Sequence, residues 1–221
     1  MPRRRRRATV NSDPFVLFHH QNTPFDCLPA CVKMVIDGLA PSRLSVRQIK
    51  EALQTDEAGT DMVTPQGFTI KERLDNLISN HRLPIRAFEQ ITGGIDINRL
   101  EVLPRSGRYP IASLLVNTGG DRIKVLCTYD TGDLYHEIVI IKVDREVNLI
   151  YALDPNCSQR DGLDSLTKYS YKNLPSTTIE IPQFIRYWRA AERRTIYFEP
   201  KETFKAMGQS TLQVTDEGRC E

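Results

Sequence analysis

Cys27 is the residue of this sequence whose type and surroundings most clearly indicate chemistry. It follows Asp26 directly, comes shortly after Gln21 and precedes a helix-forming segment. The N-terminus of a helix favours a thiolate, because the peptide dipoles and free N–H groups stabilise negative charge. If that thiolate attacks a carbonyl, the resulting oxyanion needs donors. We expect the Cys27 backbone N–H and the Gln21 side-chain amide to be those donors.

Two later polar residues have the chemistry that such a nucleophile requires. His136 lies within the apolar segment 134–141, and Asp154 follows the apolar segment 147–153. An imidazole inside a run of Ile and Val needs a buried partner, and a hairpin between the two segments would place Asp154 beside it. We therefore predict that His136 exchanges protons with the Cys27 thiol and that Asp154 orients the imidazole.

These side chains must be positioned by a helical first half and a strand-rich second half. Apolar residues at helical spacing predict helices at 27–37, 45–54 and 66–80, with Thr64 and Pro65 introducing the third, and a late helix around 182–188. Apolar runs between turn signals predict strands at 83–88, 111–116, 122–129, 134–143, 147–153 and 195–199. The expected fold is α+β, with a helical lobe carrying the nucleophile packed on an antiparallel β-sheet.

Three motifs resemble those of the bacteriocin-processing peptidases, a C39-like family of papain-like cysteine peptidases that removes double-glycine leader peptides. The residues from Gln21 to Gly38 resemble the opening motif, His136 to Ile140 the histidine strand, and Asp154-Pro155 the Asp-Pro motif. The resemblance implies a cysteine peptidase (a hydrolase) with Cys27 as nucleophile, His136 as base, Asp154 as orienting acid and Gln21 as oxyanion-hole residue. It also implies a peptide or protein substrate, cleaved after small residues such as glycine.

The sequence departs from that family at two points. Leu28 stands where the family usually has glycine, which bears on how wide the substrate cleft is. The family is often fused to an exporter, but here no apolar stretch reaches the roughly 18 residues of a membrane span, and no nucleotide-binding P-loop motif is present. We therefore expect a stand-alone member with no membrane span.

Composition supports one domain with a substantial core. The chain has 221 residues, is 40% hydrophobic and carries a net charge of +2, which argues against a dedicated nucleic-acid-binding domain. We expect a flexible basic arm at 1–14, a peptidase domain at 15–200 and a flexible tail at 201–221. The arm contains the run Arg3 to Arg7, which could contact nucleic acid or an acidic surface non-specifically. Nothing after these arginines resembles a signal peptide, so a cytoplasmic location is expected; the oligomeric state is left open.

The cysteines indicate reduced thiols and no metal centre. Their number is odd, five, and they are scattered, which is unlike a disulfide framework. Cys27 and Cys31 have the spacing of two ligands on one helical turn, but no second Cys or His pair has the spacing of a structural zinc site. We therefore expect no metal and no cofactor, and we interpret Cys31, Cys127 and Cys157 as small core residues. The cluster of Arg186, Arg189, Arg193 and Arg194 is interpreted as a solvated helix face, with Trp188 pointing inward.

Three other functions remain open at this point. The chain could be a catalytically silent peptidase-like module that binds a peptide for a partner. It could be a thiol acyltransferase of the transglutaminase or arylamine acetyltransferase type, which uses the same Cys, His, Asp order. It could also bind nucleic acid through the basic arm alone.

Overall fold

The computed structural model describes residues 18–23, 25–40, 42–56, 59–61, 64–116, 134–156 and 177–201. The predicted strand at 122–129, the arm at 1–14 with its arginines, and Cys127, Cys157 and Cys220 lie outside these ranges. So does all of the predicted tail except Lys201. The predicted domain limits therefore stay predictions.

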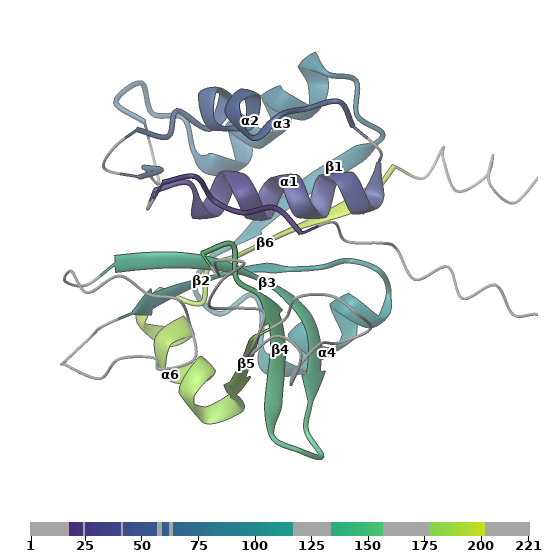
Figure 1. The fold of residues 1–221 in the computed structure, drawn as a ribbon, viewed down its shortest axis with the longest axis vertical. Helices are drawn as coiled ribbons and strands as arrows, with labels where there is room; N and C mark the ends of the chain where they lie inside the picture. The colour runs from purple at the N-terminus through teal and green to yellow at the C-terminus, as the bar shows by residue number, and fades with distance from the viewer. Residues whose placement is uncertain are drawn as a thin grey trace, which may run out of the picture.

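The described part of the chain forms one antiparallel sheet with helices on both faces (Figure 1). Its strands are β1 (Ile85–Gln90), β2 (Ile111–Val116), β3 (Leu134–Asp144), β4 (Leu149–Leu153), β5 (Thr177–Glu180) and β6 (Thr195–Pro200), in the spatial order β1-β6-β2-β3-β4-β5. Its helices are α1 (Cys27–Leu39), α2 (Val46–Leu53), α3 (Ile70–Asn80), α4 (Ile97–Arg105) and α6 (Ile181–Ala190). This is the predicted α+β class, with α1 packed on the sheet.

Two hydrophobic cores lie on opposite faces of the sheet. The first joins α1, α2 and α3 to the sheet and contains Val139 and Ile141 of β3. The second contains Ile138 and Ile140 of the same strand, together with residues of α4 and α6 such as Trp188. Successive strand residues point to opposite faces, so β3 contributes to both cores. Between residues 136 and 141 both faces of β3 are buried, which is why this part of the strand is an almost continuous apolar run.

Helix α1 is buried on every side through most of its length. All ten residues from Cys27 to Ile36 are buried, because α1 lies between the sheet and helices α2 and α3 (Figure 1). Asp26 occupies the N-cap position, but its side chain does not cap the helix. Instead, its carboxylate forms an ion pair with Lys50 of α2, with Nζ and Oδ1 2.6 Å apart. This contact ties the Cys27 end of α1 to the helical lobe.

One predicted helix begins at a different residue, and two elements were not predicted. Helix α3 begins after Thr69, not after Thr64, because Thr69 and Glu72 form a complete capping box; Thr64 instead accepts a hydrogen bond from the Phe68 N–H at 3.0 Å. Helix α4, capped by Asp96, was not predicted. Strand β5 was not predicted either.

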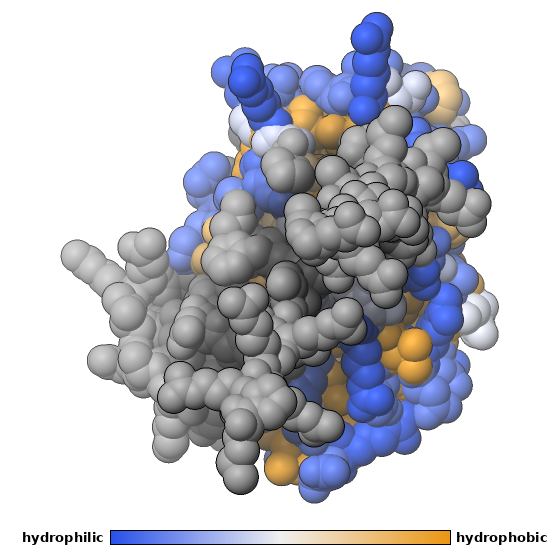
Figure 2. Space-filling model, turned by 90° about the vertical axis from the view of Figure 1, so that its right-hand side faces the viewer, coloured by the Kyte–Doolittle hydropathy of each residue, from blue (hydrophilic) through white to orange (hydrophobic). Residues whose placement is uncertain are grey.

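Hydrophilic and hydrophobic side chains are both visible on one face of the described part (Figure 2). There, small hydrophobic areas are separated by hydrophilic side chains. Within the described ranges, no helix combines the length and the hydropathy needed to cross a bilayer.

Candidate functional site

Cys27 is the first residue of α1, and its side chain faces the sheet. Only 7% of the residue is exposed. Its thiol donates a hydrogen bond to Oε2 of Glu137 in β3, with Sγ and Oε2 2.7 Å apart. One turn later, the Cys31 thiol donates to the backbone carbonyl of Glu137 at 3.3 Å. The helix N-terminus is therefore joined to β3 through two thiols and a single residue of that strand.

The surroundings of Cys27 favour the thiol over the thiolate, contrary to the expectation from its helix position alone. Burial raises the pKa of Cys27 well above its ordinary value, and the nearby carboxylate of Glu137 raises it further. Burial likewise raises the pKa of Cys31, with added contributions from Cys27, Glu137 and Asp154. Desolvation and a like charge here outweigh the helix dipole, whose effect is smaller.

His136 and Asp154 form a second buried pair, as the hairpin argument predicted. Nε2 of His136 lies 2.8 Å from Oδ1 of Asp154, and both side chains are almost fully buried. The same Oδ1 atom accepts the Asn156 N–H at 2.9 Å, which fixes the carboxylate at the end of β4. Because Nε2 is bonded to Asp154, a proton exchanged between this imidazole and a nucleophile would have to pass through the other ring nitrogen, Nδ1.

His136 and Glu137 are adjacent on β3, and their side chains are directed to opposite faces of that strand. Glu137 faces α1, because it contacts both thiols of that helix. His136 precedes Glu137 on the strand, so its side chain is directed to the other face. It shares that face with Leu114, its partner on β2. The structure thus joins Cys27 to Glu137 and His136 to Asp154, and the predicted contact between Cys27 and His136 stays a prediction.

Gln21 is attached to the turn that follows Asp154 and to the nearby Thr23. Its backbone N–H donates to the Pro155 carbonyl at 2.9 Å, so the segment before α1 is attached to the turn that carries Asp154. Its side-chain amide donates to the Thr23 carbonyl at 3.0 Å. The oxyanion role of Gln21 would require that amide to turn from Thr23 toward the Cys27 backbone N–H.

Glu137 and Arg194 are the polar residues of this region that the sequence interpretation missed. Glu137 could have been noticed as a carboxylate directly after His136 inside an apolar strand, since such a group needs partners. Arg194 was interpreted as part of a solvated face, and this was wrong: only 3% of it is exposed. Its guanidinium binds Glu89 at 3.0 Å, whereas Arg186 and Arg189 are exposed as expected.

Two further observations limit what this site contains. Leu28 is buried in the core shared by α1 and the sheet, so its side chain fills the interior beneath the nucleophile. Within the described ranges, no group of three or more Cys, His, Asp or Glu side chains is arranged to hold a metal ion.

Comparisons with known proteins support the fold. The structure is similar to that of a protein from Bacillus anthracis assigned as a C39-like peptidase, with a TM-score of 0.54 and 14% sequence identity. The match covers 84% of this chain and 95% of that one. No protein-family model matches the sequence, and no curated protein is significantly similar to it. The chain therefore shares its fold with that C39-like protein.

Proposed function

We propose that this protein is a cysteine peptidase that hydrolyses a peptide bond through Cys27, His136 and Asp154. The observation that carries the proposal is the buried His136–Asp154 pair, 2.8 Å between Nε2 and Oδ1, on the strand against which the Cys27 end of α1 packs. A second support is the fold shared with a C39-like peptidase. The resemblance of the motifs suggests a substrate preference: peptides with a small residue, such as glycine, before the cleaved bond.

The reaction would use each group in a distinct role. The Cys27 proton passes to Nδ1 of His136, and the sulfur attacks the carbonyl carbon of the substrate. The oxyanion is held by the Cys27 backbone N–H and the Gln21 amide. The imidazolium then gives its proton to the leaving amine, and water hydrolyses the acyl-enzyme. Asp154 keeps the imidazole in the correct tautomer.

This mechanism requires one rearrangement of the described conformation. The Cys27 sulfur must turn from Glu137 toward the imidazole, and a working pair would have the sulfur and Nδ1 about 3–4 Å apart. Because His136 and Glu137 are directed to opposite faces of β3, rotation of the Cys27 side chain alone is not sufficient, and the start of α1 must move relative to that strand.

The proposal is tested with a thiol-directed probe built on a glycine-containing peptide. Wild-type protein should be labelled at Cys27 and should cleave members of a mixed peptide library, both detected by mass spectrometry. Cys27→Ala should remove labelling and cleavage while keeping the circular dichroism spectrum. Cys31→Ala is the matched control, since it removes a buried thiol one turn further along α1 and should keep both signals. Undiminished labelling of Cys27→Ala would reject the assignment.

One observation favours a second candidate, the catalytically silent peptide-binding module. The Cys27 thiol is 7% exposed and bonded to a carboxylate that opposes its ionisation. A silent module would bind glycine-containing peptides equally well as wild type and as Cys27→Ala, measured by calorimetry, and would release them uncleaved. Leu28 does not explain such silence, because it is buried in the core.

A further inference from the structure

Glu137 stands at the centre of a buried chain of polar contacts that begins at the nucleophile. One carboxylate oxygen, Oε2, accepts the Cys27 thiol at 2.7 Å. The other, Oε1, accepts the hydroxyl of Ser113 at 3.2 Å, from the opposite position on β2. Only 5% of Glu137 is exposed. A buried carboxylate of this kind needs compensation by donors or by a cation.

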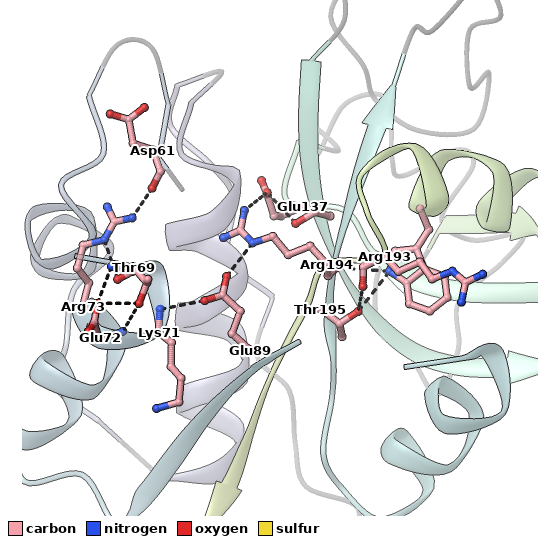
Figure 3. A network of polar contacts seen from close by, with 12 residues as sticks. Asp61, Thr69, Lys71, Glu72, Arg73, Glu89, Glu137, Arg193, Arg194 and Thr195 are labelled. Carbon is pink, nitrogen blue, oxygen red and sulfur yellow. Dashed lines mark hydrogen bonds and ion pairs between the residues drawn. The ribbon is translucent and has the colours of Figure 1, made fainter. Parts of the chain in front are cut away.

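Within the described part of the chain, Arg194 is the cation that pairs with Glu137, and it is only partly engaged. Its Nη1 atom is 4.0 Å from Oε1 of Glu137, at the outer limit of an ion pair. Its Nη2 atom is buried and has no hydrogen-bond partner within the described part of the chain. Figure 3 shows the guanidinium lying between Glu89 and Glu137. A guanidinium can bind a carboxylate with two parallel hydrogen bonds, so Arg194 has capacity that the present arrangement does not use.

The far side of Arg194 is fixed in place. Its Nε atom donates to Oε1 of Glu89 at 3.0 Å. The other oxygen of Glu89 accepts the backbone N–H of Lys71, at the start of α3, at 3.1 Å. Arg194 is thus anchored to β1 through Glu89, which in turn contacts α3. Glu137 contacts the Cys27 thiol with one carboxylate oxygen and faces Arg194 with the other.

These contacts give the Glu137 carboxylate two alternative partners. We propose that Glu137 is a positioning residue that holds Cys27 as an unreactive thiol, and that its movement onto Arg194 releases Cys27 for attack. The inference rests on the proposed function in taking Cys27 as the nucleophile. The proton stays on sulfur while Glu137 accepts the hydrogen bond. After release it passes to His136, and Glu137 remains a carboxylate in both states.

The charged and titratable groups around Cys27 agree with this role. Neither Cys31 of α1 nor Asp154 at the end of β4 can supply positive charge to the Cys27 sulfur. Asp154 instead raises the pKa of the Cys31 thiol. Arg194, which precedes β6, pairs with the carboxylates of Glu89 and Glu137. Burial, and then Glu137, raise the pKa of Cys27. Removing the Glu137 charge should therefore lower it.

The test is the pH dependence of Cys27 alkylation by iodoacetamide, with the label located by tandem mass spectrometry. Glu137→Gln keeps the size and polarity of the side chain but removes its charge. We expect its alkylation profile to move to lower pH, with alkylation at pH 7.5 at least about threefold faster for each pKa unit lost, because more thiolate outweighs its weaker intrinsic reactivity. A profile that stays in place or moves to higher pH would overturn the proposal.

Glu89→Gln is the matched control. It removes a carboxylate from the same network and from the same arginine, but one that does not touch Cys27. A general loosening of the fold would speed alkylation equally in both variants, whereas the proposed role predicts a larger effect in Glu137→Gln, because only that variant removes the carboxylate that accepts the thiol hydrogen bond. If Glu137→Gln fails to fold, Glu137→Asp keeps the charge and withdraws it from the sulfur, and a smaller shift in the same direction is expected.

This experiment separates the inference from the proposed function. Iodoacetamide needs no peptide-binding cleft, so the profile reports on the thiol even if no peptide is cleaved. Peptide cleavage lost in Cys27→Ala but faster in Glu137→Gln would support both. Faster alkylation without any cleavage would support the role of Glu137 and reject the peptidase.

Discussion

Neighbouring residues of one strand form two buried polar pairs with opposite electrostatic character. His136 pairs with Asp154, so any positive charge that develops on the imidazole is stabilised by a carboxylate. Glu137 pairs with Cys27, so any negative charge that develops on the sulfur is opposed by a carboxylate. The base is prepared for its proposed role, while the nucleophile is restrained.

The difference follows from the alternation of side chains along β3. A strand that is buried on both faces can direct adjacent polar residues into two separate cores. Here Glu137 faces α1, and alternation directs its neighbour His136 to the other face of β3. Catalysis in the proposed form requires these two sites to exchange a proton, so a movement of the start of α1 relative to β3 would separate a resting state from an active one.

The largest effect should come from removing the base. His136→Ala should slow the labelling of Cys27 by the peptide probe about 10²–10⁴-fold, because general-base assistance typically contributes that much. Labelling is followed by mass spectrometry over time at pH 7.5. If the labelling rate were unchanged, the His136–Asp154 pair would be purely structural and the two pairs would not cooperate.

The chain offers a matched control for that variant. His19 also pairs with an aspartate, with its Nε2 atom 3.0 Å from Oδ2 of Asp37, near the other end of α1. His19→Ala removes a similar pair from the same helix without touching β3. Its labelling rate should remain that of the wild type, so a loss shared by both variants would indicate damage to α1 and not loss of a base.

The restrained thiols should also make stability depend on pH in alkaline solution. The folded-state pKa values of Cys27 and Cys31 are raised, so their contribution is fully present below the unfolded value of about 8.5. Above that pH the unfolded chain loses protons that the folded chain retains. The free energy of unfolding should then fall by about 1.4 kcal/mol per pH unit for each thiol, until the folded pKa is reached.

Urea unfolding between pH 7.5 and 10 measures this dependence. Tyrosine and lysine side chains titrate in the same range, so the informative quantity is the difference in slope between variants. Cys27→Ala and Cys31→Ala should each have a shallower slope than the wild type, by one thiol. Equal slopes in all three proteins would mean that neither thiol is held protonated by the fold.

The sequence was sufficient to predict one of the two pairs. His136 lies in an apolar run, and the requirement for a buried partner together with the hairpin return predicted Asp154 correctly. Local signals were equally informative at β2, which spans 111–116 as predicted, and at α2, where Ser45 and Gln48 form a capping box. Each of these predictions depends on interactions between residues close in sequence or joined by one turn.

The pairing of Cys27 with Glu137 could not be predicted, for a physical reason. Residues 138 to 141 are all apolar, because both faces of β3 are buried. An alternating pattern would have revealed which face meets α1, and a continuous run does not. Whether His136 or Glu137 faces the thiol therefore depends on packing between distant elements. The same holds for Arg194, whose burial depends on carboxylates from β1 and β3.

The smallest expected effect concerns the ion pair between Lys50 and Asp26, which holds the Cys27 end of α1. Lys50 pairs at 2.6 Å with Asp26, the residue directly before Cys27. The Lys50 side chain is 31% exposed, whereas that of Asp26 is only 4% exposed. Lys50→Met should leave a buried carboxylate without its cation and lower the free energy of unfolding by about 1–2 kcal/mol, between the values typical of exposed and of buried pairs. Urea unfolding at pH 7 measures this loss.

The same helix provides the comparison for Lys50. Arg47 pairs with Glu51 in solvent, so Arg47→Met removes an ion pair from α2 without uncovering a buried charge, and its unfolding midpoint should match that of the wild type. Loosening Asp26 should also free the start of α1, so Lys50→Met should speed iodoacetamide labelling of Cys27 while Arg47→Met does not. If Lys50→Met were destabilised but labelled at the wild-type rate, the contact with Glu137 alone would hold the thiol, and the restraint would lie in β3 and not in the anchoring of α1.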